Sequence, residues 1–160
     1  MRKTALQNSI ERLLTEAYFH QQLDERITHD MLPKLAEAIE PVIDQYIAKY
    51  GSRPNVKVFR SMVNNFTQDG PRVQALLETR ESDEQRYWQT LQLHFVRYAQ
   101  RKWPTLASLH QKEIAHRACI RMKRSLPSFL FLARFATWGS TALSVEYLRL
   151  KGQIELKTAL

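Results

Sequence analysis

The chain has few of the residues that interrupt a helix or cross-link a fold. Its 160 residues include four glycines, six prolines and one cysteine, Cys119. So few turn-forming residues, with 44% hydrophobic residues, favour long helices joined by short connections around a real core. One cysteine excludes an internal disulfide framework and a multi-cysteine zinc site, which fits a reducing cytosol, and we expect it to be buried and structural. We therefore predict an all-α fold in a cytoplasmic protein.

Long apolar runs and catalytic motifs are also lacking. The most apolar run, residues 126–138, contains a proline and an arginine and is shorter than the roughly 20 residues that a membrane-spanning helix needs. No charged-then-apolar leader, glycine-rich phosphate loop or nucleophile elbow is present. His110, Glu113 and His116 lack the spacing of a zinc-hydrolase histidine pair, and no fourth ligand is evident. The sequence thus predicts no membrane partner, no enzymatic activity, no metal and no cofactor.

The charge of the chain changes between its two halves. Residues 1–80 hold eleven Lys or Arg against ten acids, whereas residues 81–160 hold thirteen against six. Such a step in charge indicates a boundary, and an acidic stretch at residues 81–84 marks where it lies. We predict a helical accessory domain of unknown role over residues 1–82 and a second, basic domain over residues 83–160.

Basic residues are dense in the middle of the second half. Ten Lys or Arg between residues 101 and 151 stand against only Glu113 and Glu146, and aromatic residues are interleaved with them. A basic surface of this density gives sequence-independent affinity for nucleic acid by releasing counterions from the phosphate backbone. A solvated basic face without a partner is the alternative interpretation.

Apolar residues recur every three or four positions along most of the chain, as in helices with one buried face. The predicted helices cover residues 10–23, 31–50, 55–67, 73–77 and 88–103, a helix from 109 or 110 to 125, and a last helix that starts between 133 and 137 and reaches 151. Ser9, Thr28 or Asp30, and Ser108 are the expected N-caps. We expect a turn at residues 69–70, and helix ends at residues 51, 104, 127 and 152, where Gly or Pro stands.

Three sequence blocks in the second half carry a resemblance to a known family. LPSF at 126–129, RFATW at 134–138 and EYLRLK at 146–151 follow an aromatic helix. In this order and at nearly this spacing, residues 86–152 resemble domain two of bacterial RNA polymerase sigma factors of the extracytoplasmic-function type. The resemblance implies a helical bundle that docks on the clamp helices of core RNA polymerase. It also implies capture of unpaired non-template bases of the minus-ten promoter element.

The resemblance also implies which side chains make these contacts. Those expected to bind DNA are Arg134, Phe135, Thr137, Trp138, Ser140, Thr141, Ser144, Arg149 and Lys151. Those expected to bind polymerase are Leu109, Glu113, His116, Arg117, Ile120 and Arg124. Stacking of an unpaired base on an aromatic ring is worth roughly 1 to 3 kcal/mol. Phe135 and Trp138 stand three apart, so they can equally be core residues on one helix face.

The chain departs from the family pattern in three places. Lys112, His116 and Arg117 replace acids that are usual on the polymerase-binding helix, which weakens a contact to basic clamp residues. The interval from Trp138 to the EYLRLK block is about one helical turn short, and a glycine follows Trp138 where a large apolar residue is common. Only eight residues follow Gly152, too few for the domain that reads the minus-thirty-five element. The sequence thus indicates a fragment of a sigma factor, a degenerate sigma factor, or a sigma factor that another protein positions on the promoter.

The sequence is also compatible with two other functions. In the first, the chain is a non-enzymatic interaction or regulatory module whose basic surface binds an acidic protein partner. In the second, the chain is a plain helix-turn-helix protein that binds duplex DNA. Residues 1–82 can receive a regulatory protein under any of these hypotheses.

Overall fold

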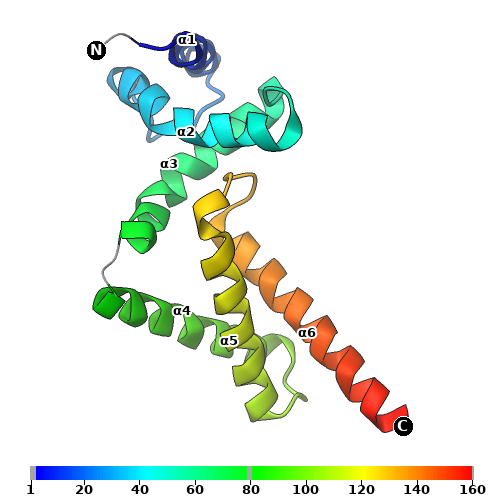
Figure 1. The fold of residues 1–160 in the computed structure, drawn as a ribbon. Coiled ribbons are helices and arrows are strands. Elements are labelled where there is room, and N and C mark those ends of the chain that lie inside the picture. The colour runs from blue at the N-terminus through cyan, green and yellow to red at the C-terminus, as the bar shows by residue number, and fades with distance from the viewer. Residues whose placement is uncertain (1–2, 79–80, 160) are drawn as a thin grey trace. The chain divides into compact units, whose positions relative to one another are not determined.

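The computed structural model describes residues 3–78 and 81–159, and this part of the chain is helical without strands (Figure 1). The predicted all-α fold is confirmed. The α-helices are α1 (Ala5–Phe19), α2 (Leu32–Tyr50), α3 (Val56–Glu78), α4 (Glu81–Lys102), α5 (Ser108–Ser125) and α6 (Phe135–Ala159), and the 3₁₀ helices are η1 (His29–Met31) and η2 (Leu126–Ser128). None of the described helices is long and apolar enough to cross a membrane.

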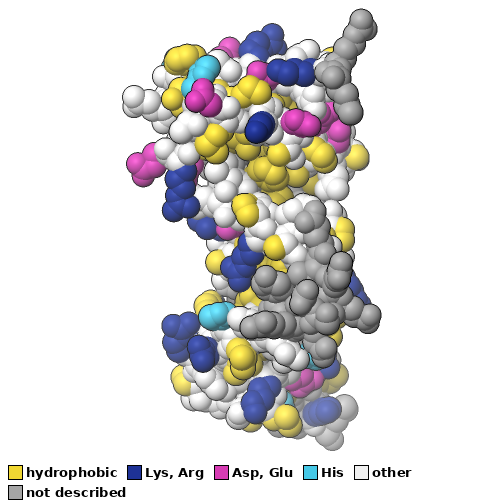
Figure 2. All heavy atoms as spheres, turned by 90° about the vertical axis from the view of Figure 1, so that its left-hand side faces the viewer, with side chains coloured by type: hydrophobic (Ala, Val, Ile, Leu, Met, Phe, Trp, Pro, Cys, Tyr) yellow, Lys and Arg dark blue, Asp and Glu magenta, His cyan; other side chains and the backbone are white. Residues whose placement is uncertain are grey.

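The fold consists of two compact units. The first unit comprises residues 1–71 and 128–134, and the second comprises residues 72–127 and 135–160. By sequence, the first unit has ten Lys or Arg against nine acids, and the second has fourteen against seven. Figure 2 shows acidic and basic side chains intermixed on the first unit. The contacts divide the chain after residue 71, and the functional boundary predicted at residue 82 stays a prediction.

The core of the first unit lies among α1, α2 and the first part of α3. Its fully buried side chains include Leu14, Ile39 and Met62, each 0% exposed. The helix α1 begins at Ala5 rather than after Ser9, so that predicted start is wrong. The physical reason is a capping box: the Thr4 hydroxyl accepts the N–H of Gln7 at 3.0 Å, and the Gln7 side chain accepts the Thr4 N–H at 3.3 Å.

The turn predicted at residues 69–70 is also wrong, because α3 continues through it. The carboxylate of Asp69, which would close a turn, is buried and accepts hydrogen bonds from Arg134 Nε at 2.9 Å and Nη2 at 3.1 Å. Gly70 lies over the ring of Phe66. Pro71 stands inside the helix, where it removes one backbone hydrogen bond. A contact with a residue far along the chain thus overrides the local turn signal.

The segment 128–134 is held in the first unit by contacts with α3. Asn65 donates its side-chain N–H to the carbonyl of Phe131 at 2.8 Å, and the Phe66 ring meets the Phe131 ring edge-on at 5.1 Å between centroids. Phe131 has a φ of 57°, a left-handed conformation that a bulky residue seldom adopts. The bond from Asn65 and the burial of the Phe131 ring stabilise this conformation.

In the second unit, α5 packs against both α4 and α6. The predicted helix ends before Pro104 and near Pro127 are confirmed, as is the end of α2 at Gly51, which has a φ of 79°. Ser108 is not the cap of α5 but its first residue, after Ala107. The predicted end at Gly152 is wrong, since α6 runs on to Ala159. A helical glycine costs only about 1 kcal/mol, and the good helix formers around it offset that cost.

Candidate nucleic-acid interface

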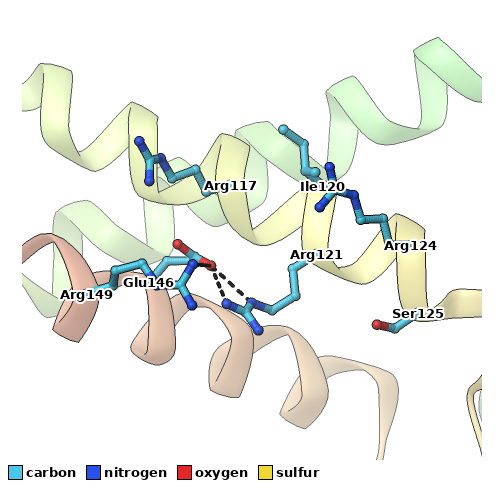
Figure 3. Close-up of a pocket in the computed structure, with 7 residues that line it drawn as sticks. All are labelled: Arg117, Ile120, Arg121, Arg124, Ser125, Glu146 and Arg149. Carbon is cyan, nitrogen blue, oxygen red and sulfur yellow. Dashed lines mark hydrogen bonds and ion pairs between the residues drawn. The ribbon is translucent and has the colours of Figure 1, made fainter.

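A hollow of about 390 Å³ lies between α5 and α6 in the second unit (Figure 3). We call it the arginine groove. Its lining residues are Arg117, Ile120, Arg121, Arg124, Ser125, Glu146 and Arg149. The three arginines of α5 lie at spacings of four and three, which places them along one face of the helix.

Glu146 organises the base of the arginine groove. Its side chain is 4% exposed, and its Oε1 accepts hydrogen bonds from Arg121 Nε at 3.0 Å and Nη2 at 2.8 Å. Arg149 Nη1 lies 4.0 Å from the same oxygen. A buried carboxylate requires such charge-assisted hydrogen bonds to offset its desolvation. The pair therefore joins α5 to α6 and fixes the guanidinium of Arg121 within the groove, as Figure 3 shows.

The lining of the groove carries an excess of positive charge. Four arginines stand against the single carboxylate of Glu146. Arg117 pairs with Glu113 one turn away at 2.9 Å, outside the hollow, and Arg124 makes no ion pair with any residue the structure describes. The planar fork of a guanidinium matches the oxygens of a phosphate or carboxylate. The arrangement can therefore bind an anionic group such as a phosphate or a carboxylate.

The residues predicted to bind polymerase lie on the exposed side of α5. Arg117, Ile120 and Arg124 line the arginine groove. Leu109 lies at the start of the helix and is 75% exposed. The exposed His116 has its Nδ1 3.4 Å from the side-chain oxygen of Gln92 on α4. Glu113 is half-buried and pairs with Arg117.

The residues of the RFATW block differ in accessibility: its two aromatic rings are buried or half-buried, and its other side chains are exposed. Arg134 belongs to the first unit and pairs with Asp69 there, and this hydrogen bond raises the pKa of its guanidinium. Phe135 is 2% exposed, so its ring is enclosed in the core of the second unit. Trp138 is half-buried and meets Phe135 edge-on at 5.9 Å. Thr137 is exposed on α6.

The other predicted DNA-binding residues lie along α6. The hydroxyl of Ser140 donates to a backbone carbonyl one turn earlier at 3.1 Å, and that of Thr141 does so at 3.0 Å. Ser144 is half-buried, while Arg149 and Lys151 are exposed. Of this set, only Arg149 lines the arginine groove, where it meets three residues predicted to bind polymerase.

Sequence reasoning missed three groove residues: Arg121, Ser125 and Glu146. The signal in the sequence was Glu146, one of two acids in a stretch with ten basic residues. An acid in such a stretch has basic residues on all sides and is expected to form an ion pair with one of them. Cys119, on α5, is buried as predicted. Burial raises the pKa of its thiol to about 12, so the cysteine lacks the thiolate character of a reactive site.

Comparisons with known proteins leave the chain without an assigned family. No protein-family model, no curated protein and no solved structure gives a significant match. Within residues 3–78 and 81–159, no group of three or more His, Cys, Asp or Glu side chains could hold a metal ion. The interpretation of function therefore depends on the three sequence blocks and on the geometry of the arginine groove.

Proposed function

We propose that this chain is a non-enzymatic, cytoplasmic transcription protein of the sigma-factor type, which binds promoter DNA and core RNA polymerase through its second unit. The observation that carries the proposal is the arginine groove, in which α5 and α6 together present four arginines around one carboxylate. The blocks LPSF, RFATW and EYLRLK, on which the resemblance depends, lie around η2 and along α6. The same α6 supplies Glu146 and Arg149 to the groove.

In this proposal the groove holds the phosphate backbone of the promoter. Arg117, Arg124 and Arg149 bind successive phosphates, because guanidinium forks match phosphate oxygens and the bound cations release counterions. Phosphate contacts position the strand without reading its sequence. The polar side chains Thr137 and Thr141 lie exposed on α6 and are the candidates for base-edge contacts.

Base capture and polymerase binding require other parts of the second unit. Because Phe135 is enclosed, the half-buried ring of Trp138 is the better candidate to stack on an unpaired base. Leu109 and His116, exposed on α5, are the candidates for contact with polymerase. The first unit, which the predicted accessory domain of residues 1–82 largely covers, is the candidate site for a regulatory protein.

The test combines selection and transcription with the full chain. We expect the chain to associate with purified core RNA polymerase and to enrich a defined motif from a random pool of single-stranded DNA. Arg117→Gln with Arg124→Gln should weaken binding of that motif about tenfold or more, since two charge-assisted contacts are lost. Trp138→Ala should reduce the preference for the motif over a scrambled strand while helical content, measured by circular dichroism, is retained.

Other outcomes would overturn the proposal. Equal affinity for every polyanion, without association with polymerase, contradicts it and supports a module that binds an acidic protein. The exposed Ile120 on the groove wall favours that second candidate, because an apolar spot among cations suits an amphipathic acidic segment. Preference for duplex over single-stranded DNA supports a plain helix-turn-helix protein instead.

A further inference from the structure

A second hollow in the second unit shares no lining residue with the arginine groove. It has a volume of about 360 Å³ and involves α3, α4 and α6. Its lining residues are Arg72, Leu91, His94, Phe95, Tyr98, Arg101, Phe135, Ala136, Ser140 and Leu143. A smaller hollow of about 260 Å³ also uses Arg72, Leu91 and His94. We call the larger one the α4/α6 pocket, and its size is that of a small-molecule site.

The floor of the α4/α6 pocket is apolar and well ordered by packing. Leu91, Phe95, Phe135 and Leu143 contribute to it, and each is at most 8% exposed. The Phe95 ring lies directly on α6 because residue 139 is glycine: a Cβ there would stand 2.9 Å from the Phe95 Cζ. The close approach fixes the ring in position, so the floor presents a preformed apolar surface to a ligand.

The rim of the pocket is cationic. Arg72 and Arg101 contribute two guanidinium groups, and among the residues whose side chains the structure describes no acid lines either hollow. The Arg72 guanidinium carbon lies 4.8 Å from the centroid of the Phe135 ring, which makes a cation–π contact. Neither arginine makes an ion pair or hydrogen bond with another described residue.

We propose that the α4/α6 pocket binds a small aromatic carboxylate, with its ring on the apolar floor and its carboxylate on Arg72 or Arg101. This inference is independent of the proposed function. A nucleobase fits less well, because its edge requires several polar partners. The Ser140 hydroxyl already donates to the Ala136 carbonyl at 3.1 Å, and the Tyr98 hydroxyl already accepts from Lys102 at 3.3 Å.

The test uses 2-naphthoate as the probe, with 2-naphthylmethanol as its neutral analogue and acetate as an anion without a ring. Binding to the full chain is measured by isothermal titration calorimetry. We expect 2-naphthoate to bind about tenfold more tightly than the alcohol, because a charge-assisted pair is lost in the alcohol. Acetate should show no saturable binding, since it lacks the apolar ring.

Variants locate the site. Arg72→Gln and Arg101→Gln should each weaken 2-naphthoate binding, by about tenfold for the arginine that holds the carboxylate, and should leave the alcohol unaffected. Ala136→Trp, at an exposed position of α6, should fill the pocket and abolish binding of both while circular dichroism shows the wild-type helical content. Arg124→Gln in the arginine groove is the matched control and should leave the affinity unchanged.

Three results would overturn the proposal. The acid and the alcohol binding equally well would show that the arginines take no part. An equal loss on Arg124→Gln and Arg72→Gln would show binding by charge alone. Binding that persists in Ala136→Trp would place the ligand elsewhere.

Discussion

At the scale of single residues, two buried carboxylates determine what the arginines do. Asp69 forms an ion pair with Arg134 in the first unit, and Glu146 forms one with Arg121 in the second. In both cases one carboxylate desolvated by folding receives two hydrogen bonds from one guanidinium. An arginine in such a pair is committed to the fold, which distinguishes it from Arg124, whose charge no described residue neutralises.

Arg134→Met should therefore lower the stability of the protein. The substitution removes two hydrogen bonds to the buried Asp69 carboxylate, at a cost of about 2 kcal/mol in the free energy of unfolding. Urea denaturation followed by circular dichroism measures the change. In the double variant with Asp69→Leu, most of the loss should be recovered, because an apolar pair needs no hydrogen bond. A single-variant loss indistinguishable from zero would show that the pair has no structural role.

At the scale of elements, local sequence signals predicted a helix end correctly where the backbone conformation of a glycine or proline set that end. Gly51 ends α2 because it adopts a left-handed conformation, and proline disfavours helix in the residue before it, which ends α4 ahead of Pro104. Gly70 and Gly152 misled the prediction of helix ends, because both lie inside helices. Intrinsic propensity is a weak preference, and neighbouring residues or packing readily override it.

The two glycines of α6 should respond to alanine in opposite directions. Nothing lies within 4 Å of a Cβ at Gly152, so Gly152→Ala should raise the free energy of unfolding by about 0.5 kcal/mol through helix propensity. Gly139→Ala places its Cβ 2.9 Å from the Phe95 ring and should lower the free energy by about 1 to 3 kcal/mol through overpacking. Thermal and urea unfolding measure both. Shifts of the same sign would contradict the close packing of Phe95 on α6.

At the scale of the whole molecule, positive charge belongs to the second unit. The first unit is nearly balanced, while the second holds twice as many basic as acidic residues. A nucleic acid should therefore bind through the second unit, and its affinity should fall with salt in proportion to the phosphates contacted there.

Removing two positive charges should change the salt dependence of nucleic-acid binding only when they are removed from the second unit. Arg117→Gln with Arg124→Gln should reduce the slope of log affinity against log salt by about 1 to 2, since each phosphate contact on a single strand contributes about 0.7. Lys34→Gln with Lys49→Gln removes the same charge from exposed sites of the first unit and should leave the slope unchanged. Fluorescence anisotropy of a labelled single strand between about 50 and 200 mM NaCl measures both slopes. Equal reductions would mean that binding follows net charge alone.

The all-α class, the approximate course of most helices and the concentration of basic residues beyond residue 100 could be predicted before folding was considered. These properties follow from composition, apolar spacing and formal charge, which are local or additive. The folded structure was needed to show that Arg134 is paired within the first unit, that Phe135 is enclosed, and that arginines from α5 and α6 meet around Glu146. These outcomes depend on contacts between residues far apart in the chain, and burial and pairing are properties of such contacts rather than of any one segment.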